Sequence, residues 1–236
     1  MGCCLLLRLG RVEYAAAWEL QRRLVEARRA GEVGDVLILL EHPHVYTLGR
    51  RPDESHVLVG EAGLAALGAS LFRIDRGGDV TYHGPGQLVG YPILDLKRRG
   101  ADVHRYVHDV EEVIVRTLAD FGIAGGRLAG YPGVWVGDEK VAAIGVKVAH
   151  WISSHGFALN VGPDLSYFGH IVPCGLHDRG VTSIARLLGR RVGLEEAASR
   201  LEVRFAEVFG CELAPTSLPT LLPGHGSLLD AGPAPR

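Results

Sequence analysis

The sequence predicts an α+β fold, in which helices pack on a mixed and partly antiparallel β-sheet. Short apolar or alternating segments, typical of strands, are interspersed with helical periodicities along the chain. The two kinds of segment do not alternate strictly, so an all-parallel sheet is disfavoured. The 236 residues, 47% of them hydrophobic, suffice for one sizeable domain. We therefore expect a single domain over residues 1–213 and a flexible, proline-rich tail over residues 214–236.

The first hundred residues open with a strand and an amphipathic helix. In that helix Ala17, Leu20 and Leu24 share one face. An uninterrupted apolar run then indicates a buried strand, and Gly68 ends a short helix. In chain order we expect a strand at 3–9, a helix at 14–31, strands at 35–40 and 45–48, a helix at 61–67 and a strand at 71–75.

The second half contains a long helix with recognisable ends, because Asp102 is a suitable N-cap and Gly122 a suitable stop. A turn at Gly137 separates two extended segments and predicts a hairpin. In chain order we expect a helix at 102–121, strands at 134–136, 140–149 and 153–161, and helices at 182–188 and 194–209.

Composition excludes several classes of protein. A formal net charge of −2 gives no reason to expect nucleic-acid binding. The four cysteines do not form a closely spaced disulfide framework, so we expect reduced thiols and a cytoplasmic protein. Leu6 breaks the myristoylation pattern, and the N-terminal apolar run is too short for a signal peptide or a membrane span.

Cys174 is a candidate nucleophile. Pro173 and Gly175 place it in a tight, irregular segment, and a neighbouring glycine lets a substrate approach the backbone closely. A buried structural cysteine remains the alternative, since isolated cysteines usually pack as small hydrophobes. The setting favours a reactive thiol without deciding the question.

Lys140 is a candidate base for that thiol, because a desolvated lysine can be neutral and accept a proton. Only three of the 25 cationic residues are lysines. Strict alternation along the strand would place Lys140 on one face with Ala142, Ile144 and Val146, and Lys147 on the other. A surface lysine beside a turn is the alternative, and spacing alone does not decide between them.

Residues 76–87 form the densest cluster of glycines and polar side chains. Paired Gly77 and Gly78 can turn backbone amides toward a carbonyl or an anion. On a short strand Thr81 and His83 would face inward and Tyr82 outward. A glycine-rich hairpin loop would explain the glycines but not the polar side chains beside them.

A metal site is not expected, although the chain has eleven histidines. The spacings from His170 to Cys174 and from Cys174 to His177 would suit zinc. Neither a second nearby cysteine nor an HExxH pair accompanies them.

Several segments together resemble the lipoyl/octanoyl transferases of lipoate synthesis. They are residues 41–50, 76–87, 140–147, 154–161, 171–176 and 181–184. They occur in the family's order and extend over roughly residues 35–190, whereas the tail lies outside. His44 departs from the pattern, which more often has proline there.

The resemblance implies the fold of biotin and lipoate protein ligases. It also implies that Cys174 carries an acyl thioester, that Lys140 lowers its pKa and acts as acid and base, and that no cofactor is needed. The implied substrate-binding residues are Arg76, Gly77, Gly78, Asp79, Val80, Thr81, Tyr82, His83, Ala143, Ile144, Gly145, Gly156, Phe157 and Ala158.

The implied reaction moves an octanoyl or lipoyl group from acyl carrier protein to a lysine of a lipoyl domain. The implied acceptors are the lipoyl domains of 2-oxoacid dehydrogenase complexes and the glycine cleavage H protein, with no nucleic acid or membrane involved. One alternative is a lipoate or biotin protein ligase, which needs ATP to form an acyl-adenylate and needs no thiol. The other is a non-catalytic module that binds lipoyl domains.

Overall fold

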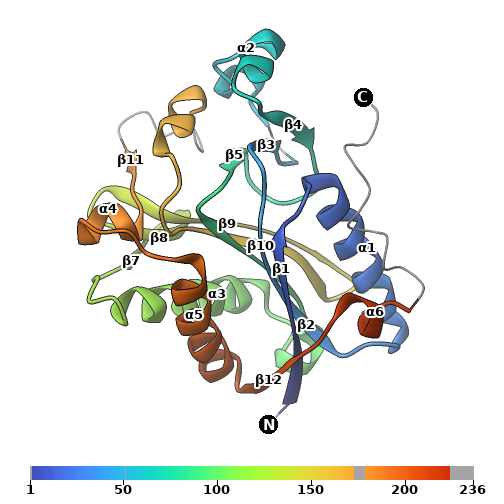
Figure 1. Ribbon diagram of the computed structural model, residues 1–236. Coiled ribbons are helices and arrows are strands. Elements are labelled where there is room, and N and C mark those ends of the chain that lie inside the picture. The colour runs from blue at the N-terminus through green and yellow to red at the C-terminus, as the bar shows by residue number, and fades with distance from the viewer. Residues whose placement is uncertain (1, 51, 173–178, 224–236) are drawn as a thin grey trace.

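A large mixed sheet forms the centre of the molecule (Figure 1). The computed structural model describes residues 2–50, 52–172 and 179–223. Within these ranges the strand order is β12-β1-β2-β6-β10-β9-β8-β7, and β11 pairs with β9. The strands are β1 (Gly2–Arg11), β2 (Asp35–Glu41), β6 (Gln87–Ile93), β7 (Gly126–Leu128), β8 (Tyr131–Val136), β9 (Glu139–Ala149), β10 (Ile152–Asn160), β11 (Gly180–Val181) and β12 (Cys211–Pro215).

The sheet mixes both kinds of pairing, as the sequence predicts. β1 pairs in parallel with β2 and with β12, and β11 is parallel to β9. The pairs from β2 through β6, β10, β9 and β8 to β7 are antiparallel. The predicted α+β class with a partly antiparallel sheet is therefore confirmed.

A second, smaller sheet lies beyond one end of the main sheet (Figure 1). Its strands are β3 (Val45–Leu48), β4 (Ser70–Arg73) and β5 (Val80–His83). β3 is the central strand, parallel to β4 and antiparallel to β5. The helix α2 (Glu61–Ala66) and the 3₁₀ turn η1 (Glu54–His56) connect β3 to β4. This sheet carries the glycine-rich segment that follows residue 75.

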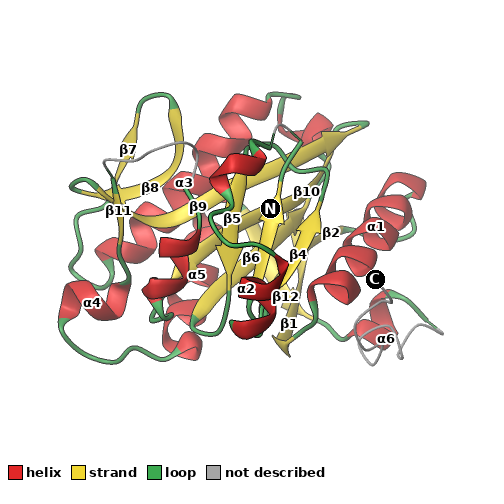
Figure 2. Ribbon diagram, turned by 90° about the horizontal axis from the view of Figure 1, so that it is seen from above, coloured by secondary structure: helices red, strands yellow, loops and turns green. Residues whose placement is uncertain are grey.

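Helices cover both faces of the main sheet (Figure 2). The helix α1 (Tyr14–Ala30) and the short α6 (Leu218–Leu221) lie on one face, and α3 (Val103–Ala119) and α5 (Leu194–Phe209) lie on the other. The side chain of Asp102 caps α3 by accepting a hydrogen bond from the Arg105 amide. The remaining helical elements are η2 (Leu96–Arg99), η3 (Leu165–His170) and α4 (Ile184–Leu188).

Each face of the main sheet has its own hydrophobic core. Against α3 and α5 the strands bury a large cluster that includes Leu118, Phe157 and Phe205. Against α1 and α6 they bury a second cluster that includes Leu24 and Tyr91. Burial of these apolar side chains is the main favourable contribution to folding.

The chain remains folded beyond the expected domain boundary. β12 extends to Pro215 through parallel pairing with β1, and α6 follows it. Leu218 and Leu221 are buried in the cluster under α1. The expectation of a flexible tail from residue 214 is therefore wrong as far as residue 223, because a neighbouring strand and an apolar surface hold this segment. Residues 224–236 lie outside the described ranges.

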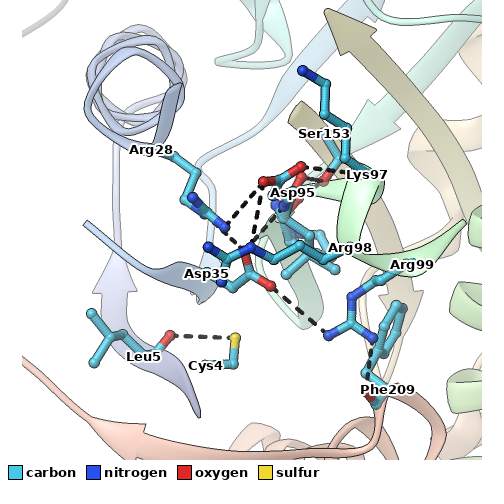
Figure 3. A network of polar contacts seen from close by, with 12 residues as sticks. Cys4, Leu5, Arg28, Asp35, Asp95, Lys97, Arg98, Arg99, Ser153 and Phe209 are labelled. Atoms are coloured by element: carbon cyan, nitrogen blue, oxygen red, sulfur yellow. Dashed lines mark hydrogen bonds and ion pairs between the residues drawn. The ribbon is translucent and has the colours of Figure 1, made fainter. Parts of the chain in front are cut away.

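An ion-pair network fastens α1 and α5 to the sheet where β2 begins (Figure 3). The Arg28 guanidinium on α1 lies 2.9 Å from Asp35 Oδ1 and 3.5 Å from Asp95 Oδ2. Arg99 lies 3.9 Å from Asp35 and donates to the Phe209 carbonyl at the end of α5. Arg28 is buried, so these carboxylates offset the free-energy cost of burying its charge.

Within the described ranges, no helix combines the length and hydrophobicity that crossing a bilayer requires.

Candidate active site

A cavity of about 250 Å³ lies where β9 and β10 meet the segment that follows Asp75. Most of the predicted substrate-binding residues line it. These residues are Arg76, Gly77, Gly78, Asp79, Val80, Thr81, His83, Ala143, Ile144, Gly145, Gly156, Phe157 and Ala158. Lys140 lines the same cavity, so the structure brings β9, β10 and the segment that follows Asp75 to one place.

Small residues form the floor of the cavity. Ala143 pairs with Ala158 and Gly145 pairs with Gly156, so the four lie side by side on β9 and β10. A Cβ atom at residue 145 would lie 2.9 Å from Arg76 Cδ and 3.1 Å from the Gly77 carbonyl oxygen. The segment that follows Asp75, here called the roof, therefore packs directly on Gly145 and leaves no room for a side chain there.

Arg76 holds the roof in place. Its buried guanidinium donates to the Thr47 carbonyl at 2.6 Å, to Thr47 Oγ1 at 2.9 Å and to the Gly77 carbonyl at 3.0 Å. The Gly77 amide donates to the Val146 carbonyl at 2.9 Å, which joins the roof to β9. Gly78 has a φ of 88°, a left-handed conformation that favours glycine. The glycine-rich segment is thus a fixed cover over the cavity.

Asp79 fastens the far side of the roof. Its carboxylate accepts a hydrogen bond from the Asp53 amide at 3.0 Å and is paired with the His56 ring. The Gly49 amide donates to the Asp79 carbonyl at 3.0 Å. These contacts fix the chain that follows β3, next to Arg50, whose amide donates to the Arg76 carbonyl.

Lys140 faces the cavity because β9 contains a bulge. Val134 pairs with Ala142 whereas Trp135 pairs with Lys140, so Val141 is one extra residue that shifts the alternation. Lys140 therefore falls on the same side of β9 as Gly145 and Lys147. The expectation that Lys140 and Lys147 lie on opposite faces is wrong for this reason.

The Lys140 side chain lies over β8. Its Nζ is 3.4 Å from the Pro132 carbonyl oxygen and 4.7 Å from the centre of the Trp135 ring. Lys140 is only 9% exposed. Such burial penalises the charged form of a lysine, whereas the Pro132 carbonyl and the Trp135 ring stabilise it.

The end of the cavity farthest from Lys140 is aromatic and polar. Tyr14 at the start of α1, His83 on β5 and Tyr91 on β6 line it. Burial lowers the pKa of His83 well below its ordinary value and raises the pKa of Tyr14. These groups are therefore neutral across the physiological range. Sequence analysis missed Tyr14 and Tyr91, since both resemble ordinary core residues in an amphipathic helix and a buried strand.

His155 also lines the cavity, and its backbone is unusual. Its φ is 55°, which is rare in a strand and turns the ring toward Asp75, 2.8 Å from Nε2. Asp75 is also paired with Lys147. The hydrogen bond from His155 is the largest cause that lowers the pKa of Asp75, followed by the Lys147 contact. Lys147 is thus held beside the roof by its ion pair with Asp75.

Among the described residues, one predicted substrate-binding residue does not line this cavity. The Tyr82 side chain is buried on the other side of β5, where its hydroxyl lies 2.7 Å from His44 Nδ1 and its ring stacks on Tyr167. This agrees with its outward position in the alternation, and the cavity lining does not include it. Cys174 and His177 lie outside the described residues.

The residues that flank residues 173–178 lie close to the cavity. Ile171 pairs with Val57, and the Val172 amide donates to the His56 carbonyl at 2.8 Å. On the other flank Val181 pairs with Lys140. Among the described residues, no cluster of histidine, cysteine or carboxylate side chains could hold a metal ion.

Comparison with known proteins identifies the family. The Lipoyl protein ligase A/B catalytic domain matches residues 13–206. An octanoyltransferase of Solibacter usitatus is 52% identical over 215 residues, which are 91% of this chain and 97% of that protein. The chain belongs to the octanoyltransferase family. The resemblance seen in the sequence segments is thereby confirmed, and so is the predicted acyltransferase class.

Solved structures share the fold of this octanoyltransferase family member. A bipartite lipoate protein ligase of Thermoplasma acidophilum superposes with a TM-score of 0.72 at 16% identity, over 98% of this chain and 91% of that one. A biotin protein ligase of Aquifex aeolicus, solved with biotin and ATP, gives a TM-score of 0.54 at 15% identity, over 87% and 70%. At these identities the likeness concerns the fold alone, and the predicted ligase-like fold is confirmed.

Proposed function

We propose that this protein transfers an octanoyl group from acyl carrier protein to a lysine of a lipoyl domain, with Cys174 as the nucleophile and Lys140 as the acid and base. One observation carries the proposal beyond the family assignment. Lys140, a buried amine, lines a largely apolar cavity floored by alanine and glycine. Such a cavity suits an aliphatic chain and a lysine that gains and loses a proton.

In the first step Lys140 accepts the proton of the Cys174 thiol, and the thiolate attacks the carbonyl carbon of the donor thioester. A bond forms from the Cys174 sulfur to the acyl carbon, and the bond to the carrier sulfur breaks. Protonated Lys140 returns its proton to the leaving thiolate. One thioester replaces another, so the step is nearly isoenergetic and requires no ATP.

In the second step the neutral ε-amine of the acceptor lysine attacks the acyl carbon. Lys140 takes the proton that the attacking nitrogen loses, and the Cys174 thiolate leaves and recovers that proton. An amide replaces a thioester, which makes the step effectively irreversible. We propose as acceptors the lipoyl domains of 2-oxoacid dehydrogenase complexes and the glycine cleavage H protein.

Intact-mass measurement after incubation with octanoyl-acyl carrier protein tests the nucleophile. The wild-type protein should gain one octanoyl group without ATP, and Cys174→Ser should gain none because an alcohol without a strong base is a poor nucleophile. Cys211→Ser is the control, since Cys211 is buried beside β1 at a distance from the cavity. An adduct on Cys174→Ser that is absent from Cys211→Ser would contradict the assignment.

Lys140→Arg tests the proton transfer. Arginine keeps the positive charge but cannot accept a proton at ordinary pH. The variant should therefore transfer the acyl group to the lipoyl domain at least about 100-fold more slowly. Wild-type rates and an unchanged pH profile would exclude Lys140 as acid and base. A strict need for ATP in the wild type would instead favour the ligase reaction.

A further inference from the structure

Tyr14 lines the end of the cavity that lies over β6. Lys140 lies on β9, whereas Tyr91, beside Tyr14, lies on β6, two strands away across β10. Tyr91 follows Gly90, the partner of Phe157, so it lies level with Gly156 and Gly145 and is also five residues along β9 from Lys140. A chain whose carbonyl lies beside Lys140 would run over the small floor residues and end at Tyr14.

Tyr14 cannot easily move aside. It is the first residue of α1, and the Val12 amide just before it donates to the Glu41 carbonyl at 2.9 Å. Its ring centre lies 5.1 Å from that of His42 and 5.3 Å from that of Phe72. It stacks on His83 at 6.1 Å with 12° between the ring planes. Tyr14 is only 3% exposed, so the tyrosine forms a fixed wall.

The Tyr14 hydroxyl differs from the other polar groups at this end. The Tyr91 hydroxyl lies 2.7 Å from His42 Nε2, and His83 Nδ1 lies 3.3 Å from Gln87 Oε1. The Tyr14 hydroxyl makes no hydrogen bond to any described residue, although Tyr14 lines the cavity. A buried hydroxyl without a protein partner depends on contact with water, and removing that contact is costly.

We propose that Tyr14 determines the longest acyl chain that the enzyme accepts, because a chain long enough to reach it would press against its ring and strip water from its hydroxyl. This inference rests on the proposed function and adds a specificity-determining residue to it. Each additional methylene buried against an apolar surface would otherwise increase the affinity for the acyl chain roughly fourfold. Longer chains would be preferred if the cavity were open at this end, and Tyr14 reverses that preference.

The experiment compares acyl-pantetheine donors of six, eight, ten and twelve carbons, with kcat/KM measured for each in the same preparation. Tyr14→Phe removes the hydroxyl and keeps the wall, so the ratio of decanoyl to octanoyl transfer should rise several-fold. Tyr14→Ala opens the end, and the same ratio should rise at least about tenfold. Because each ratio is taken within one variant, partial unfolding cancels.

Tyr106→Phe is the matched control. Tyr106 is also 3% exposed, and its hydroxyl likewise has no hydrogen-bond partner among the described residues. It lies on α3, on the opposite face of the sheet, so its chain-length profile should equal that of the wild type. A merely structural effect of losing a buried hydroxyl would alter both variants alike and would overturn the inference.

The inference and the proposed function fail in different ways. If the wild-type protein gained no octanoyl adduct, the proposed function itself would be wrong. If it gained the adduct, but Tyr14→Ala and Tyr14→Phe kept the wild-type chain-length profile, only the role of Tyr14 would be refuted.

Discussion

On one face of the main sheet α3 and α5 pack directly onto the strands, whereas on the other face α1 and α6 cover only part of the surface (Figure 2). Over β9 and β10 that second face carries alanine and glycine under the roof of Arg76. The first face is filled with large apolar side chains such as Leu118 and Phe205. The floor of the cavity thus lies on the side opposite the larger core, and Val107, Ile144 and Phe157 reach the cavity from that core.

Filling the floor should have the largest effect on activity. Gly145→Val places side-chain atoms within about 3 Å of Arg76 Cδ and the Gly77 carbonyl, so the roof should be displaced from β9. We expect kcat/KM for octanoyl transfer to fall at least about 100-fold. Ala149→Val, near the end of the same strand and outside the cavity lining, should stay within about twofold of the wild type. Similar rates for both variants would show that the floor is not a binding surface.

Removing a large side chain from the core under α3 and α5 should reduce stability and leave activity unchanged. Leu118 is fully buried against α5 and the sheet, and Leu118→Ala should lower the free energy of unfolding by about 3 kcal/mol. Denaturant unfolding measures this loss. At a temperature where the variant is folded, its kcat/KM should remain near that of the wild type. A large fall in kcat/KM for the folded variant would mean that the two faces are coupled.

Lowering the pH should reduce the free energy of unfolding through His42, which is buried on the face that holds the cavity. Burial lowers the pKa of His42 from 6.5 to about 4, opposed by the hydrogen bond to the Val12 carbonyl. The unfolded chain takes up a proton near pH 6.5 and the folded one only near pH 4, so stability is complete above that window and falls as pH decreases through it. The slope should approach about 1 kcal/mol per pH unit. Free energies of unfolding for the wild type and His42→Phe between pH 4 and 7 measure it, and an equal slope in both would disprove the assignment.

The smallest effect is expected at Lys147. It shares its side of β9 with Lys140 but is paired with Asp75 beside the roof. Arginine can keep that ion pair, so Lys147→Arg should change kcat/KM by less than about twofold. A loss like that expected for Lys140→Arg would show that both lysines take part in proton transfer.

Much of the fold could be predicted because its signals are local. The pattern of residues 194–209 gives the bounds of α5, and Asp102 marks the start of α3. β12 could not be predicted, since its pairing with β1 depends on a partner about 200 residues earlier. Long-range pairing of this kind leaves no local periodicity.

In the candidate site, too, local features could be predicted from the sequence and features that depend on long-range packing could not. Motif segments identify the roof and the floor, because glycine and polar residues are unusual together. The bulge at Val141, which turns Lys140 toward the cavity, has no sequence signal, and neither has the positive φ of His155. The role of Tyr14 could not be predicted from the sequence for a different reason. Its position at the end of the cavity arises only when α1 is packed on the sheet.

The position of β1 between β2 and β12 has a consequence for synthesis on the ribosome. β1 can pair with β2 as soon as residue 41 has emerged, but its other edge stays unpaired until residues 211–215 are made. That edge belongs to a largely apolar strand, and an exposed edge of this kind can pair with another nascent chain. Slow translation of α5 would prolong this exposure, so we expect the aggregation of nascent chains to depend on how quickly β12 is completed.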